Sequence, residues 1–411
     1  MIPRARRLGP ALAAFVALGC GTAAFAAPSR PAPASPSPSA APTAPALPAG
    51  AQSTTINGTR IETDLTNWNQ QTGDFSMPHR VRFVRPGTDG IADRATGNSK
   101  NGTITLYGHV VVHDAGGATQ SLSGGAPTAG AAATLTCDTL AIDSKGKVYT
   151  ATGNVHFSQA GRTGSADRGT LDRNSNVLHL EGNVILNDAG SAMTGSSVND
   201  NLTTKVVDMQ GSPLILKQMS PGAAVADQVE TDEAHYNQNS GDFTMPHKAK
   251  FSRPGTDATG DHANGNTKRG TLTLEGNVVV HDNGNAPEGN SEDAYSKGGP
   301  STMNCDKLDV DAKSKLYTAS GNVKFEQGTR KGSADFGVLD RTNETLHLNG
   351  KVHLADGAST MAGDNVEYNL ATKDVVARGA PIIITQPIPS HEPRPASPTP
   401  KAKSKKFRLP I

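Results

Sequence analysis

Two stretches of this 411-residue chain decide its fold: residues 164–186 read GSADRGTLDRNSNVLHLEGNVIL, and residues 332–354 read GSADFGVLDRTNETLHLNGKVHL. Apolar residues take every second position in the later half of each, as in Leu178, Leu180, Val184 and Leu186. This period of two places them on one face of a β-strand. Gly182 lies mid-strand, where a glycine usually marks a bend. We therefore predict a strand bent at its centre, with Gly182 on the apolar face.

The two stretches belong to a longer duplication. GDFSMPHRVRFVRPGTD, at residues 73–89, returns as GDFTMPHKAKFSRPGTD at residues 241–257, again 168 positions later. The constant offset relates residues 61–216 to residues 229–384 without a gap. Self-similarity at a fixed offset is the signature of a repeat architecture.

A shorter unit repeats inside each copy. Its centres are spaced by 29, 45, 29 and 29 residues, and the long step contains an insertion, at residues 115–131 and 285–300, that we expect to form a loop. A histidine stands at the first centre of each copy and may be expected to plug the interior there. The centres are His79, Gly108, Gly153, Gly182 and Gly211, then His247, Gly276, Gly321, Gly350 and Gly379.

Each unit is predicted to be a short alternating strand, a turn, a long bent strand and a loop. Such units cannot bury an apolar face alone, but stacked along an axis they form an elongated core. We expect an all-β protein made of an antiparallel sheet folded over its apolar face, with open strand edges at both ends. A parallel β-helix is the less consistent alternative, because its coil does not need a hairpin-like period of 29 residues.

The ends of the chain differ from the repeats. Residues 1–26 have the arginines, apolar run and Ala-Phe-Ala ending of a cleaved signal peptide, which predicts export to the periplasm; a lipoprotein anchored through Cys20 is the alternative. Residues 27–51 form a predicted Pro/Ala/Ser-rich linker. Residues 387–411 form a predicted disordered, Pro-rich basic tail, which could contact an anionic surface or simply remain solvated.

The charge balance excludes one class of partner. The chain has 39 Lys+Arg against 38 Asp+Glu, a net charge of +1, so no global field favours nucleic acid. We therefore expect no nucleic-acid partner.

The pattern G-x-A-D followed by L-x-L-x-G-N-V-x-L resembles the OstA-like family of lipopolysaccharide-transport proteins, which includes LptA, LptC and the N-terminal domain of LptD. GSADRGTLDRNSNVLHLEGNVIL, GSADFGVLDRTNETLHLNGKVHL and, at residues 363–379, GDNVEYNLATKDVVARG carry the resemblance. It implies two tandem domains, residues 52–217 and 218–386, each an open β-jellyroll. The family has usually one such domain in its bridge protein.

The resemblance also implies a function: carrying lipopolysaccharide, or a related glycolipid, from the inner to the outer membrane through an apolar groove. The implied partners are LptC-like and LptD-like proteins, bound by pairing of edge strands, with end-to-end self-association as a further possibility. The candidate groove lining is Phe75, Met77, Phe83, Val110, Val112, Tyr149, Val155, Phe157, Leu178, Leu180, Val184, Leu186, Phe243, Met245, Phe251, Leu274, Val278, Val280, Tyr317, Val323, Phe325, Leu346, Leu348, Val352 and Leu354. The alternative is that these residues pack as the closed core of a structural or surface-binding solenoid, with the inserted loops as the recognition elements.

Signals for other chemistry are weak. Cys137 and Cys305 are equivalent positions about five units apart, too far for a disulfide, and are interpreted as small buried residues. His113 and His281 lack the spacing of zinc ligands, so no metal and no cofactor are expected. The carboxylates recur with the repeat as turn formers do, which makes a polysaccharide-cleaving enzyme the weakest hypothesis. We predict that the chain is not an enzyme.

Overall fold

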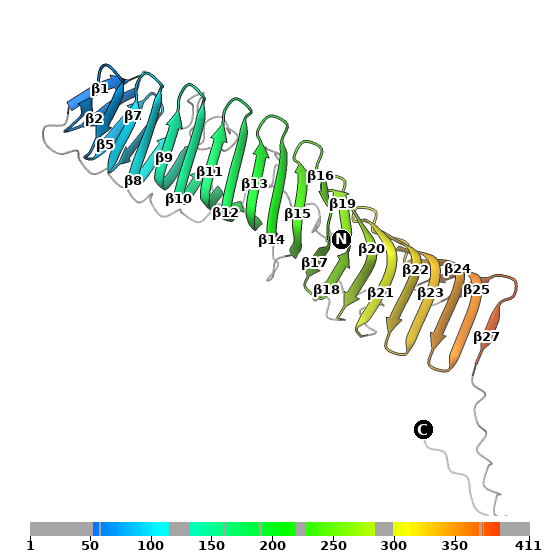
Figure 1. Cartoon of the computed structure of the whole chain (residues 1–411). Helices are drawn as coiled ribbons and strands as arrows, with labels where there is room; N and C mark the ends of the chain where they lie inside the picture. The colour runs from blue at the N-terminus through cyan, green and yellow to red at the C-terminus, as the bar shows by residue number, and fades with distance from the viewer. Residues whose placement is uncertain are drawn as a thin grey trace, which may run out of the picture.

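The computed structural model describes residues 52–56, 59–114, 132–159, 162–188, 191–218, 227–283, 299–369, 372 and 374–386. Figure 1 shows an elongated stack of strands that runs from β1 at one end to β27 at the other. The predicted signal peptide, linker and basic tail, and almost all of the two insertions, lie outside the described residues. No helix in the described part of the chain is long and apolar enough to cross a membrane.

The described strands form one antiparallel sheet. Those of the first copy are β1 (Gln52–Ile56), β2 (Thr59–Thr63), β3 (Asn67–Trp68), β4 (Asp74–Met77), β5 (Val81–Arg85), β6 (Thr88–Ala92), β7 (Arg94–Asn98), β8 (Thr103–Asp114), β9 (Ala133–Asp143), β10 (Val148–Gln159), β11 (Arg162–Asp172), β12 (Val177–Asp188), β13 (Ser191–Asn201) and β14 (Val206–Gln218). Those of the second are β15 (Asp227–Asn237), β16 (Asp242–Met245), β17 (Ala249–Arg253), β18 (Thr256–Gly260), β19 (His262–Asn266), β20 (Thr271–Asp282), β21 (Ser301–Asp311), β22 (Leu316–Gln327), β23 (Arg330–Asp340), β24 (Thr345–Asp356), β25 (Ser359–Asn369), β26 (Val375–Arg378) and β27 (Ile383–Thr385).

Consecutive strands pair along most of the stack, as in β10 with β11 and β11 with β12. The return strands of the hairpins are nearly as long as the others: β11 has 11 residues and β12 has 12. The expectation of a shorter strand before each turn is therefore wrong, because the alternation in GSADRGTLD continues through its glycines and polar residues.

The sheet is continuous where the two copies meet. β14 pairs with β15 from Val206 opposite Asn237 to Gln218 opposite Asp227. One buried cluster spans this junction, from Ala166 in the first copy to Val323 in the second. The division into domains at residue 217 stays a prediction, because nothing in the sheet interrupts the stack there.

Two consecutive residues with positive φ bend the strand at six of the glycine centres. Gly182 has φ of 75° and Asn183 of 47°, a combination that a type I′ turn also requires and that Gly and Asn tolerate. Opposite them, β13 contributes only Ser196 between the paired residues Gly195 and Ser197. The bend predicted from the sequence is thus a β-bulge made by the Gly-Asn pair.

The predicted facing of Gly182 is wrong. A Cβ added there would lie 2.3 Å from Oδ2 of the exposed Asp167, on the outer side of the bend. Leu180 and Val184 both point inward, with exposed fractions of 3% and 0%. The bulge turns the backbone between them, so the period of two does not place the glycine on their face.

The remaining centres bend in other ways. Proline follows two of them, with cis peptide bonds at Ser212–Pro213 and Ala380–Pro381. At the histidine centres the long strand is split, and β16 and β17 are separated by Pro246, His247 and Lys248. Every predicted centre therefore marks a bend, but the backbone solution differs among them.

Candidate functional site

A hydrogen bond on the outer side fastens each bend to the neighbouring strand. Asn183 Nδ2 donates to Asp167 Oδ2 at 2.9 Å, which joins β12 to β11. The same contact, 16 residues apart in the sequence, recurs at Asp138–Asn154, Asp261–Asn277 and Asp306–Asn322. The Asp of each G-x-A-D or C-D element is therefore a clasp for the bend that follows it.

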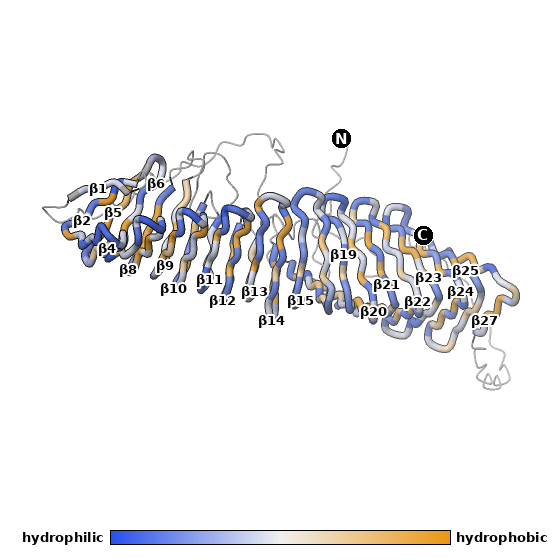
Figure 2. Tube along the Cα trace, turned by 45° about the horizontal axis from the view of Figure 1, so that its top comes forward, coloured by the Kyte–Doolittle hydropathy of each residue, from blue (hydrophilic) through white to orange (hydrophobic). Residues whose placement is uncertain are grey.

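Inside the bend, the strands present apolar side chains in rows along the stack. Figure 2 shows apolar and polar residues alternating along the strands. The predicted lining residues next to the bends are buried, whereas many of those at the strand ends are half-buried. The half-buried ones are Tyr149, Phe157, Leu178, Leu186, Val280, Tyr317, Phe325, Leu346 and Leu354.

The other predicted lining residues are buried. They are Phe75, Met77, Phe83, Val110, Val112, Val155, Leu180, Val184, Phe243, Met245, Phe251, Leu274, Val278, Val323, Leu348 and Val352. The structure thus places the whole predicted set on the inner face, but it exposes only the strand ends. Whether these residues bind a lipid stays a prediction.

Most aromatic residues of the inner face lie over a glycine of the adjacent strand. Phe157 pairs with Gly164, and a Cβ at Gly164 would come within 2.2 Å of the Phe157 ring. Phe325 and Gly332 repeat the arrangement in the second copy, where the distance would be 2.0 Å. The glycines leave room for each ring to lie against the sheet, and this keeps the ring from projecting across the interior.

Burial of the strand ends divides the inner face along its length. The strand ends of β10 and β12 are half-buried at Tyr149, Phe157, Leu178 and Leu186, which we call the first open stretch. Their equivalents on β22 and β24, Tyr317, Phe325, Leu346 and Leu354, form the second open stretch. Between them, the strand ends of β14 to β17 are buried, and we call this set the closed centre: Val207, Leu216, Val229, Tyr236, Phe243 and Phe251.

The first unit of the chain is closed in the same way as the centre. Phe75 and Phe83, the equivalents of Phe243 and Phe251, are each 5% exposed. The histidine of the unit does not close it. His79 has a side-chain exposure of 55%, and its Nδ1 lies 2.9 Å from Asp64 Oδ1 on the outer side. The prediction that the histidines plug the interior is therefore wrong, and the phenylalanines fill it instead.

The sequence analysis missed the contribution of the return strands. Leu135, Leu171 and Met193 are buried on the inner face, and Met303 and Met361 pack against the core from the second copy. Their alternation is visible in the sequence but contains fewer large apolar residues. The clasp was also missed, although its spacing of 16 residues from Asp to Asn could have shown it.

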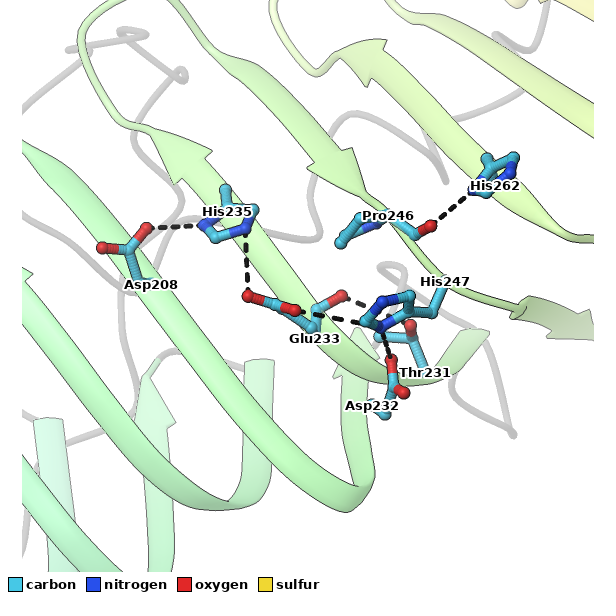
Figure 3. Close-up of polar contacts among 8 residues, drawn as sticks. All are labelled: Asp208, Thr231, Asp232, Glu233, His235, Pro246, His247 and His262. Atoms are coloured by element: carbon cyan, nitrogen blue, oxygen red, sulfur yellow. Dashed lines mark hydrogen bonds and ion pairs between the residues drawn. The ribbon is translucent and has the colours of Figure 1, made fainter.

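A cluster of histidines and carboxylates covers the outer side of the copy junction (Figure 3). His235 Nδ1 lies 2.7 Å from Asp208 Oδ1 and joins β15 to β14, and its Nε2 lies 3.2 Å from Glu233 Oε1. His247 Nδ1 lies 2.9 Å from Asp232 Oδ1. These side chains are about half exposed, so each contact contributes at most about 1 kcal/mol. Searched over the described residues, the structure has no group of three or more His, Cys, Asp or Glu placed to hold a metal ion.

The two cysteines are buried free thiols, as the sequence predicts. Burial raises the pKa of the Cys137 thiol to about 12 and that of Cys305 to about 11. The thiolate is the reactive form, so both groups are inert at neutral pH.

These features define a class: an elongated, bent β-sheet whose distinguishing property is a continuous apolar inner face. Comparison with known families matches residues 159–283 to the LptC-related lipopolysaccharide-assembly family. Residues 297–374 match the family of LptA and the LptD N-terminal domain, described as lipopolysaccharide-transport protein. The chain belongs to the OstA-like family of lipopolysaccharide-transport proteins, as the sequence motif predicted.

A solved structure is also similar. The crystal structure of LptH from Pseudomonas aeruginosa, described as the LptA-homologous periplasmic component of the lipopolysaccharide transport device, is 18% identical. The match covers 32% of this chain and 95% of that chain, with a TM-score of 0.25. Among curated proteins, no match was found.

Proposed function

We propose that the chain is a periplasmic lipid-binding bridge that carries lipopolysaccharide, or a related glycolipid, from the inner to the outer membrane. The observation that carries the proposal is the row of half-buried apolar strand ends, such as Phe157 and Leu178, inside a chain of this family. Half-buried apolar side chains on the inner face offer acyl chains a surface that a filled core would not.

The physical requirement for such transport is a path of nearly constant free energy. Transfer of one methylene group from water to an apolar surface contributes about 0.8 kcal/mol, so an acyl chain that left the apolar face midway would meet a large barrier. The inner rows continue from β14 to β15 across the copy junction without a polar break. This continuity is what a lipid needs in order to slide along the sheet.

The flat placement of the aromatic rings supports the same function. Phe157 over Gly164 and Phe325 over Gly332 present ring faces to the interior. Acyl chains can pack against such a ring face without displacing it. Neither pair needs a glycine if the interior is only a filled core, because a smaller aliphatic residue could replace the phenylalanine.

The ends of the stack provide the proposed contacts with partners. At the C-terminal end, Ile383 and Ile384 of β27 are 55% and 59% exposed, and β26 exposes Val375 and Val376. Exposed apolar edge strands favour pairing with another sheet. We propose LptC-like and LptD-like proteins as partners, with end-to-end self-association as a further outcome. The chain then works by binding and not as an enzyme.

One observation favours a second function. The closed centre has the filled interior expected of a purely structural solenoid, since Phe243 and Phe251 are 5% and 9% exposed. In that account the apolar face is a core throughout, and recognition lies elsewhere on the molecule.

Photo-crosslinking in native envelopes distinguishes the two functions. A photoreactive amino acid replaces the inner residue Phe157 or its outer neighbour His156, and the second copy offers the matched pair Phe325 and Lys324. The transport account predicts glycolipid adducts at Phe157 and Phe325 only. Folded, exported protein without adducts at any of the four positions would contradict it and favour the structural solenoid.

A further inference from the structure

The two open stretches are copies of each other, separated by the closed centre. Leu178 and Leu346 are equivalent half-buried residues, as are Phe157 and Phe325. Between the stretches, the strand-end residues of β14 to β17 are all buried. At ~4.8 Å per strand, these three strand rows extend for about 14 Å along the axis.

We infer that the chain holds acyl chains of a phosphorylated glycolipid in two separate compartments, one at each open stretch, with the closed centre as a constriction between them. This inference rests on the proposed function and adds where the lipid resides. A chain that moves along the whole molecule must displace the aromatic residues of the centre, so the lipid occupies the flanking compartments at equilibrium.

The charges at the turns beside each compartment identify an anionic head group. The turn at residues 144–147 and the turn at residues 173–176 carry cations and no acidic residue, although Asp143 and Asp172 cap them. The second copy repeats the cations, and its Arg341 guanidinium lies 5.4 Å from the centre of the Tyr317 ring in the open stretch. The repeated cations are Lys145, Lys147 and Arg173, then Lys313, Lys315 and Arg341.

The closed centre lacks this feature at its own turn. Residues 238–241, which connect β15 to β16, read Gln-Asn-Ser-Gly and carry no charge. The turn after it carries Arg269, whose guanidinium is already paired with Asp242 at 3.1 Å. The positions that favour an anionic head group thus coincide with the positions where the inner face is half-exposed.

The aromatic residues of the centre also differ from their first-copy equivalents. Phe83 pairs with Gly90, where a Cβ would lie 2.2 Å from the ring. Phe251 pairs with Ala258, which has that Cβ. The Phe251 ring therefore cannot lie against the sheet as Phe83 does, and this places it as a movable part of the constriction.

The test uses the full chain and a diphosphorylated, acylated glucosamine disaccharide with a diazirine at the end of one acyl chain. After illumination, proteolysis and mass spectrometry locate the adducts. We expect adducts on residues 148–201 and on residues 316–369, and at least tenfold fewer on residues 206–253. Adducts on residues 206–253 at the same frequency as on the flanks would overturn the two compartments while leaving lipid binding intact. Absence of adducts everywhere would instead overturn the proposed function.

Matched variants test the independence of the compartments. Leu178→Arg should remove adducts from residues 148–201 only, and Leu346→Arg should remove them from residues 316–369 only. His347→Arg, on the outer face next to Leu346, is the control that should change neither. Loss of both sets from either leucine variant, with the circular dichroism spectrum unchanged, would show one shared path. Displacement of the probe by phosphatidylglycerol vesicles as effectively as by unlabelled glycolipid would overturn the glycolipid as occupant.

Discussion

The bend at Gly182 offers a quantitative test of how the fold is built. In Gly182→Ala, the new Cβ would lie 2.3 Å from Asp167 Oδ2, and the alanine would have to adopt φ near 75°. The left-handed conformation costs an L-residue roughly 1–2 kcal/mol. Displacing Asp167 also removes its hydrogen bond with Asn183, an exposed contact worth about 1 kcal/mol. The expected loss of local stability is about 2–3 kcal/mol.

Hydrogen exchange read by mass spectrometry measures this loss within one chain. Stability in stacked repeats is largely local, so the effect should centre on β12 and its neighbours. We expect the slowest amides of β12 to exchange roughly 30- to 150-fold faster. The equivalent strand β24, with Gly350 intact, is the internal control. Gly363→Ala is the control for glycine removal, because its φ is ordinary and its added Cβ would meet nothing closer than Arg378 O at 3.4 Å.

The double variant Gly182→Ala/Asp167→Ala decides the reasoning. Asp167→Ala alone should cost about 1 kcal/mol, the value of the clasp. The double variant should be no less stable than Gly182→Ala, because the alanine at 182 has already displaced the carboxylate. Simple addition of the two losses, or unchanged exchange in Gly182→Ala, would refute the account of the bend.

Three further predictions concern single positions. Burial raises the pKa of Asp200, whose Oδ1 has no hydrogen-bond partner among the described residues, so the folded state favours the protonated form; Asp200→Asn should raise the melting temperature at pH 7, and the gain should disappear below about pH 4, whereas a lower melting temperature at pH 7 would argue against it. Gly332→Ala places a Cβ 2.0 Å from the Phe325 ring and should destabilise the chain by about 1–3 kcal/mol in urea unfolding; no change would mean that the ring moves freely. Cys137 and Cys305 should resist an aromatic disulfide reagent at pH 8 until urea unfolds the chain, and rapid labelling of the native chain would contradict their burial.

The bends and the stacking of strands were predictable because they depend on local sequence. Alternation around Gly182 indicates a strand, and Gly-Asn at its centre indicates a bend. The facing of Gly182 was not predictable by counting residues, because the bulge turns the chain between Leu180 and Val184. The position of a residue relative to a bulge requires the backbone conformation.

The closed centre could not be predicted from the repeat pattern. Leu178 and Phe243 occupy equivalent positions in their strands, yet one is half-buried and the other is 5% exposed. Burial at a strand end depends on the size of the residues in the strands on both sides. Around Phe243 these are Tyr236 and Leu272, which are themselves buried. The pairing of Phe157 with Gly164 likewise depends on the register between strands.

Pulse-labelled lipopolysaccharide in cells depleted of this protein tests the central claim most directly. The transport account predicts that newly made lipopolysaccharide stays in the inner-membrane fraction, that the wild-type chain and His347→Arg restore its arrival at the outer membrane, and that Leu346→Arg does not. Normal arrival of labelled lipopolysaccharide at the outer membrane in the depleted cells would contradict the account.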